Sequence, residues 1–170
     1  MRRARADEFR DFAAGRTGHL YRSACLLTAG DTHLAEDLVQ ETLGRVYAMW
    51  GRIARIDNPA GHAQTLLVRT YLGHRRLHPA GERPPEHMPD TPSGRSDDPA
   101  RRIALLGALA ELAPKDRAVV VLRYWEDRSV DETADAMNVS SATVRTRSTR
   151  SLAQLRERLG GSLCELTATL

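Results

Sequence analysis

Apolar side chains recur at helical spacing through the first 77 residues of the chain. An opening helix or helix pair is predicted by Phe9, Phe12, Leu20, Ala24 and Leu27, with Gly15 and Gly18 as candidate interruptions. A second helix begins after an N-cap at Asp31 and has these residues near one face: Leu34, Leu38, Leu43, Val46, Tyr47 and Trp50. After a predicted loop over 52–58, Asn58 and Pro59 start a third helix that runs to about Leu77.

The same spacing returns after residue 98. Asp98 and Pro99 repeat the arrangement of N-cap and proline, and the next buried face consists of Ile103, Leu106, Leu109, Ala110 and Leu112. Pro114 starts another helix that continues to about Trp125. The β-branched residues at 119–121 would allow a strand, but the flanking helices favour a buried helix. No segment alternates convincingly with period two, so the predicted fold is all-α.

Between these two blocks lies a proline-rich segment. Residues 78–94 hold five of the eight prolines and almost no apolar side chains. Such a segment cannot continue a helix or add much to a core. We therefore predict two small helical domains, 1–77 and 99–170, joined by a flexible linker at 78–98.

The segment from Ser129 to about Leu159 has the features of a helix-turn-helix. Ser129 and Glu132 form a capping box, Ala134 leaves room for a crossing helix, and Asn138 suits the left-handed conformation of a tight turn. Ser140 or Ser141 then caps a second helix. Its inward positions are Val144, Leu152, Leu155 and Leu159.

The two helices of this motif carry opposite charge. From Ser141 to Arg158 there are five arginines against the single acid Glu157. The preceding segment is acidic, with Arg128 opposed by Glu126, Asp127, Asp131, Glu132 and Asp135. Recognition helices enter the major groove by their N-terminal part, so DNA binding is favoured over a helical hairpin with a solvated basic face. The motif alone leaves activator, repressor and sigma factor open.

Composition narrows the class of protein. A net charge of +3 permits nucleic-acid binding without requiring it. No apolar run reaches the roughly 18 residues of a membrane span, and the N-terminus turns acidic at Asp7, so a cytoplasmic protein without membrane insertion is expected. Cys25 and Cys164 have no neighbours in metal-ligand spacing, and no metal or cofactor is expected. The chain also lacks a Gly-rich phosphate loop and a nucleophile motif, which argues against an enzyme.

Several segments resemble the extracytoplasmic-function group of bacterial sigma factors, in the sigma-70 family. Residues 108–127, 129–134, 143–145 and 150–152 resemble their sigma-four domain. In the sigma-two domain, 35–43 resembles the segment that binds the clamp helices of RNA polymerase, and 70–76 resembles the end of the helix that reads the −10 element. The chain has His62 and Ala63 where the family often has an aromatic residue and Leu, Arg69 where it often has Asn, and Asn138 where it commonly has Gly.

The resemblance implies a factor that binds core RNA polymerase and directs initiation at promoter DNA with −10 and −35 elements. Core polymerase binding is expected at Asp37, Gln40 and Glu41, on an acidic helix that suits a basic partner. Contacts to the −35 element are expected from Ser141, Thr143, Arg145, Thr146, Arg147 and Arg150. Contacts to the −10 element are expected from Asp57, Asn58, Arg69, Thr70, His74, Arg75 and Arg76, with the loop at 52–61 capturing an unstacked base. An anti-sigma factor is a further candidate partner.

Two other interpretations stay open at this point. A free-standing helix-turn-helix regulator would bind DNA as a dimer, but the chain has no heptad zipper to form one. A helical adaptor or anti-sigma-binding protein would use the acidic helix without any contact to DNA.

Overall fold

The computed structural model describes residues 2–79 and 98–160, and every regular element in these two ranges is a helix. The all-α prediction is therefore confirmed. The elements are α1 (Arg2–Leu27), α2 (Thr32–Ala48), α3 (Trp50–Ile53), α4 (Pro59–Leu77), α5 (Pro99–Ala110), α6 (Pro114–Val120), the π-helical turn η1 (Val121–Trp125), α7 (Val130–Met137) and α8 (Ser141–Leu159). Most of the predicted linker, 80–97, lies outside the described residues.

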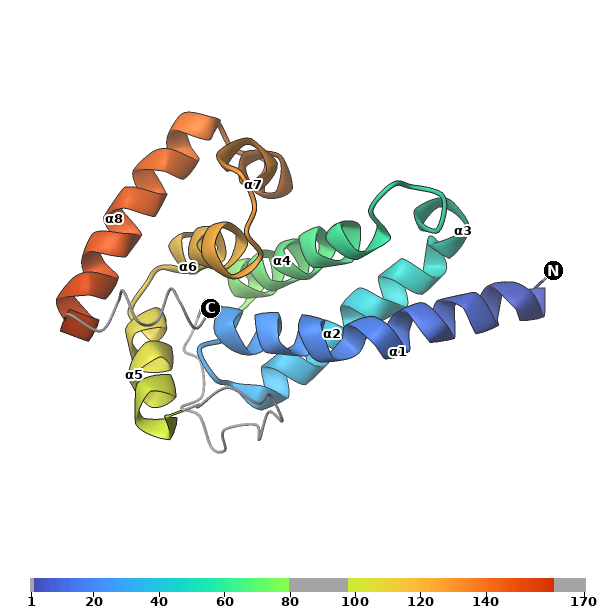
Figure 1. The fold of residues 1–170 in the computed structure, drawn as a ribbon, viewed down its shortest axis with the longest axis horizontal. Coiled ribbons are helices and arrows are strands. Elements are labelled where there is room, and N and C mark those ends of the chain that lie inside the picture. The colour runs from blue at the N-terminus through green and yellow to red at the C-terminus, as the bar shows by residue number, and fades with distance from the viewer. Residues whose placement is uncertain (1, 80–97, 161–170) are drawn as a thin grey trace.

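In the first half, α1 is one continuous helix through Gly15 and Gly18, and α2 and α4 pack against it (Figure 1). The predicted caps are present: Asp31 accepts from the amide of Leu34, and Asn58 accepts from that of Gly61. The loop predicted at 52–58 is partly wrong. A short helix, α3, occupies its start because Trp50 and Ile53 are both buried, at 3% and 4% exposure.

The second half contains the predicted helix-turn-helix, α7 and α8. Ser129 and Glu132 form the capping box with both hydrogen bonds present. Asn138 ends α7 in the left-handed conformation, with φ 55° and ψ 50°, and Ser140 caps α8. Val144 is fully buried against α6, so the two helices cross over an apolar contact.

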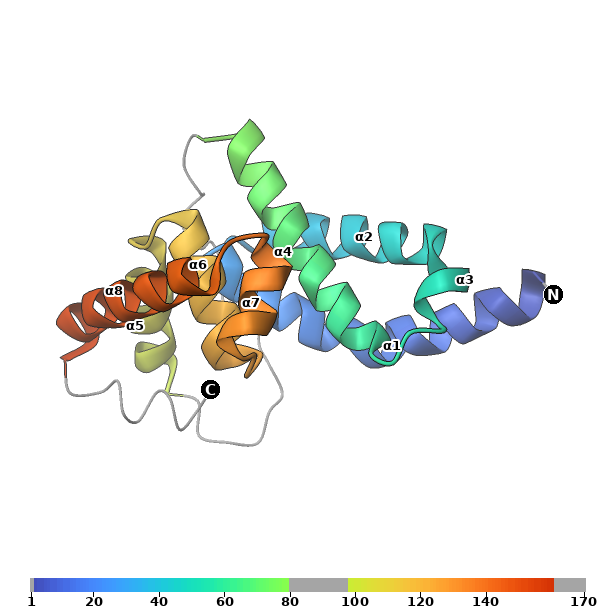
Figure 2. The same cartoon turned by 90° about the horizontal axis from the view of Figure 1, so that it is seen from above.

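The two halves share one core. Ala118, Val121, Leu122 and Ala136 of the second half belong to the same buried cluster as Leu67 and other residues of the first. Figures 1 and 2 show α6 and α7 beside α4, while α8 packs against α5, α6 and α7. The division into domains 1–77 and 99–170 stays a prediction.

Arg117 crosses the boundary between the halves. Its side chain is only 1% exposed, and its guanidinium donates to the carbonyls of Leu109 and Leu112 in its own half. It also donates to the carbonyl of Leu27 at 2.8 Å and to the hydroxyl of Tyr71 at 3.3 Å. A buried guanidinium is stable only when its donors are paired, so these acceptors hold α1 and α4 against α6.

Candidate nucleic-acid interface

The N-terminal part of α8 presents the side chains expected at the −35 element. Arg145, Thr146 and Arg150 are exposed, whereas Ser141, Thr143 and Arg147 are partly buried. The Ser140 hydroxyl accepts from the Thr143 amide at 3.1 Å, which holds the first turn. The helix therefore offers guanidinium groups and a threonine hydroxyl along one open surface, where phosphates and base edges can be met.

A buried carboxylate behind this surface was missed by the sequence analysis. Asp116, near the start of α6, accepts from Arg147 at 2.6 Å and from Arg150 at 3.1 Å. Its side chain is 9% exposed, against 25% for Arg147 and 61% for Arg150. The side chain of Arg147 is thus directed inward to Asp116, while that of Arg150 stays mostly exposed to solvent. No sequence signal links residue 116 to α8, because the two lie on helices that meet only in the folded chain.

The residues expected at the −10 element lie in α4 and in the turn before it, and they differ in exposure. Asp57, Asn58, Arg69 and Arg76 are exposed, and the side chain of Asn58 is engaged in capping α4. Thr70 is 4% exposed, so it faces the core in this structure. His74 is partly buried and stacks on His78, with ring centroids 4.6 Å apart, while Arg75 is also partly buried.

Arg69 contacts the second half of the chain. Its guanidinium donates to the carbonyl of Ala136 at 2.9 Å and to that of Asp135 at 3.1 Å, at the C-terminal end of α7. The Asp135 carbonyl also accepts from the amide of the C-cap residue Asn138 at 3.3 Å. A cation at this end of α7 is favoured by the helix dipole. Arg69, which stands where the family often has Asn, therefore joins α4 to the end of α7.

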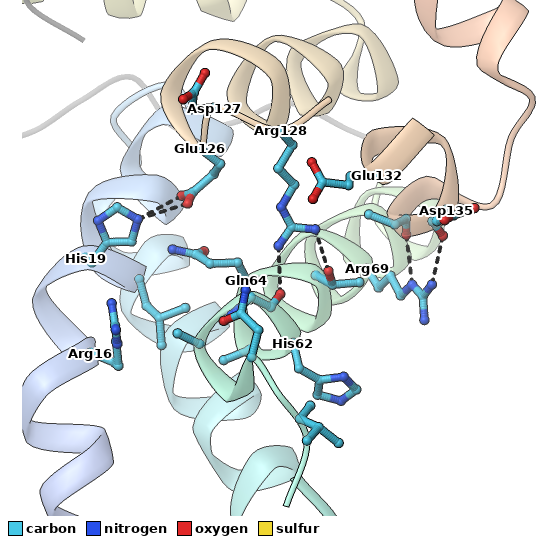
Figure 3. Close-up of a pocket in the computed structure, with 18 residues that line it drawn as sticks. Arg16, His19, His62, Gln64, Arg69, Glu126, Asp127, Arg128, Glu132 and Asp135 are labelled. Atoms are coloured by element: carbon cyan, nitrogen blue, oxygen red, sulfur yellow. Dashed lines mark hydrogen bonds and ion pairs between the residues drawn. The ribbon is translucent and has the colours of Figure 1, made fainter. Parts of the chain in front are cut away.

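Arg128 makes the converse contact from the second half to the first. Its guanidinium donates to the hydroxyl of Thr65 and to the carbonyl of Gly61, each at 2.7 Å. Burial lowers the pKa of Arg128, which reflects the loss of water around its charge. Figure 3 shows Arg69 and Arg128 reaching across the boundary in opposite directions.

Glu126 joins the second half to α1. It accepts from His19 at 3.0 Å and from the Ser23 hydroxyl at 2.5 Å, and the indole of Trp125 donates to the same hydroxyl at 3.0 Å. Between this contact and Arg69 the boundary opens into a cavity of about 680 Å³ (Figure 3).

The residues expected to bind polymerase lie on the surface of α2. Asp37, Gln40 and Glu41 are all exposed, and Glu41 pairs with Arg45 on the next turn. None of the helices in the described ranges combines the length and apolarity that a membrane crossing needs. Cys25 is buried, and burial raises its pKa to about 11, so its thiol is protonated at neutral pH.

Comparison with known proteins gives one consistent family. The sigma-70 region 4 family matches residues 108–157. RNA polymerase sigma-E factor of Streptomyces coelicolor is 37% identical over 153 residues, which cover 89% of this chain and 86% of that protein. The sigma-E factor of Streptomyces avermitilis is 38% identical, with 89% and 85% covered.

A solved structure shares the fold. The sigma factor RpoE from Bartonella quintana, crystallised with the anti-sigma factor NepR, superposes with a TM-score of 0.69 at 19% identity, over 91% of this chain and 98% of that one. The alternative of a free-standing dimeric regulator finds no support among these relatives. The chain belongs to the extracytoplasmic-function group of the sigma-70 family, and it is an RNA polymerase sigma factor.

Proposed function

We propose that this sigma factor reads the −35 element through α8, the −10 element through α4 and the turn before it, and binds core polymerase through α2. The observation that carries the proposal is the exposed row of Arg145, Thr146 and Arg150 on the N-terminal part of α8. Phosphate contacts from such arginines position a recognition helix, and contacts to base edges specify the sequence.

The assignment to α4 rests on its charge and position. Asp57, Asn58, Arg69 and Arg76 are exposed, and His74 and Arg75 are half-buried in the last turns. Thr70 would take part only indirectly, by packing. In this proposal residues 1–77 act at polymerase and the −10 element, residues 99–170 act at the −35 element, and 78–98 sets the reach between them.

The acidic surface of α2 supports the assignment of polymerase binding. Asp37 and Glu41 lie one helical turn apart and are exposed, so both carboxylates can approach a basic partner together. The Bartonella relative was crystallised with an anti-sigma factor, and the proposal includes such a factor as a partner of this chain.

The test combines purified full-length chain with core RNA polymerase and a panel of promoter DNAs. We expect a stable complex and initiation that depends on both elements. Replacing Arg145 with Ala should weaken −35 binding by roughly tenfold, since one good base or phosphate contact contributes about 1–3 kcal/mol. The proposal would be contradicted if no polymerase complex forms, or if initiation does not depend on the −35 sequence.

A further inference from the structure

The carboxylate of Asp116 lies between two arginines of α8. Arg147 and Arg150 are three positions apart in the sequence, so they share one face of α8, and α6 packs against this helix. Asp116 Oδ1 accepts from Arg147 at 2.6 Å, and Asp116 Oδ2 accepts from Arg150 at 3.1 Å. One buried acid on α6 therefore holds both guanidinium groups.

The two arginines take different parts in this arrangement. Arg147 has the less exposed side chain and makes the shorter contact, so it fixes the carboxylate from the protein side. Arg150 uses one terminal nitrogen, Nη2, for Asp116, while its side chain stays mostly exposed. Because a guanidinium carries five N–H groups in one rigid plane, most donors of Arg150 can meet a ligand, in an orientation that Asp116 sets.

Arg145 provides the contrast on the same helix. Its side chain is exposed and, among the residues that the structure describes, it has no hydrogen-bond or ion-pair partner. A guanidinium without a fixed partner can turn toward any nearby phosphate, and phosphate contacts carry no sequence information directly. A guanidinium held in one orientation can donate two parallel hydrogen bonds to a guanine edge or to one particular phosphate, which adds geometric specificity. The contact with Asp116 therefore suits Arg150 to discriminate between sequences.

We infer that Asp116 is a positioning residue for −35 recognition, which acts through Arg150 and makes it a fixed contact to DNA. The inference rests on the proposed assignment of the −35 element to α8. Asp116 also offsets part of the positive charge of the two arginines, and so limits the attraction of α8 to phosphates of any sequence. Removing its charge should strengthen nonspecific binding and weaken discrimination, a combination that loss of structure alone does not produce.

The test uses the holoenzyme assembled from core RNA polymerase and the full-length chain. The probes are fluorescein-labelled duplexes of a promoter that supports initiation, and of versions with single base-pair changes in the −35 element. Asp116→Asn keeps the size of the side chain and removes its charge. We expect the ratio of affinities for the original and the changed promoters to fall roughly fivefold. The changed promoters should bind at least as tightly as before, with a steeper salt dependence of the affinity.

Two further variants locate the effect. Asp116→Glu keeps the charge but displaces the carboxylate by one methylene, which is more than a positioned contact tolerates, so discrimination should fall with unchanged salt dependence. This variant decides alone if Asp116→Asn loses its helical circular dichroism. In an Arg150→Ala chain, Asp116→Asn should change discrimination by less than about twofold, because the arginine through which Asp116 acts is absent.

Glu111→Gln is the matched control. It removes the same charge from an ion pair with Arg158, in the last turn of α8 and beyond the residues assigned to DNA, so discrimination should stay unchanged. Unchanged discrimination in a folded Asp116 variant, including an equal loss of affinity for all promoters, would overturn the inference. So would a full effect of Asp116→Asn in the Arg150→Ala chain. In either case the proposed function would stand if the parent holoenzyme distinguishes −35 sequences, and it would be rejected if the parent does not.

Discussion

Asp116 and Arg117 are adjacent in sequence and buried, yet they act in opposite directions. Asp116 accepts from Arg147 and Arg150 of the recognition helix, and Arg117 donates to α1 and α4. Successive residues on a helix point about 100° apart, so α6 can serve two neighbours at once. The short helix α6 thus fixes the position of α8 relative to the first half of the chain.

At the same scale, the arginines of α8 differ in whether they contact Asp116. We expect Arg147→Ala to lower the free energy of unfolding by about 2 kcal/mol, because it leaves the carboxylate of Asp116 with fewer partners in a mostly buried site. Urea unfolding followed by circular dichroism measures this loss. Arg145→Ala is the control, since an exposed residue should change stability by less than about 0.5 kcal/mol while weakening −35 binding. If the two variants have equal free energies of unfolding, the contact between Arg147 and Asp116 does not stabilise the fold.

At the scale of elements, the stability of the short helix α7 depends on the contacts at its two ends. It has only eight residues, which is too few for stability in isolation. The capping box at its start, the left-handed Asn138 at its end and the hydrogen bonds that Arg69 and Arg128 make between α4 and the second half together hold it in place. Its packing on Val119 and Val144 adds an apolar contact.

The capping box makes the stability of α7 depend on pH. Hydrogen bonds from the backbone amide and side chain of Ser129 lower the pKa of Glu132. A lowered folded-state pKa means that this contribution is complete above the ordinary glutamate value of about 4.3, and is lost as the pH falls through the lowered value. We expect Glu132→Gln to reduce the slope of unfolding free energy against pH in this acidic range, measured by urea titrations at several pH values.

Removing the other partner of the capping box tests its strength. Ser129→Ala should cost about 1 kcal/mol at neutral pH, the usual cost of losing an N-cap oxygen. The control is Ser140→Ala, which removes the cap of the longer α8. If hydrogen exchange of the α7 amides does not quicken in Ser129→Ala, the cap does not limit the opening of this helix.

At the scale of the whole molecule, charge is divided between distant surfaces. Carboxylates are exposed on α2, whereas arginines are exposed on α8 at the far end of the molecule (Figure 1). The proposed assignment of α2 to polymerase and α8 to DNA fits this separation, because a surface of mixed charge would repel each partner in part.

The acidic surface of α2 gives a prediction for the polymerase complex. Asp37→Asn combined with Glu41→Gln should weaken core polymerase binding by roughly fivefold, with a smaller salt dependence and no change in −35 duplex affinity. Fluorescence anisotropy at several salt concentrations measures both quantities. Asp11→Asn, an exposed carboxylate on α1, is the control. Polymerase affinity that is the same for all three chains would place the contact elsewhere.

The local sequence predicted most of the helices because helical periodicity and caps involve residues only a few positions apart. The caps at Asp31, Asn58, Asp98 and Ser129 are present where the sequence placed them. The short helix α3 at the start of the predicted loop 52–58 was not predicted. It forms because Trp50 and Ile53 bury their side chains against other elements.

By itself, then, the sequence determined an all-α chain, a helix-turn-helix with opposite charge on its two helices, and the family to which it belongs. Only the tertiary structure decided which arginines are engaged by other residues of the chain. Arg147 meets Asp116 across 31 positions, and Arg69 meets Ala136 across 67. Helical periodicity extends over a few residues and carries no information about such distant partners, so the engagement of both arginines depends on how α4, α6, α7 and α8 pack together.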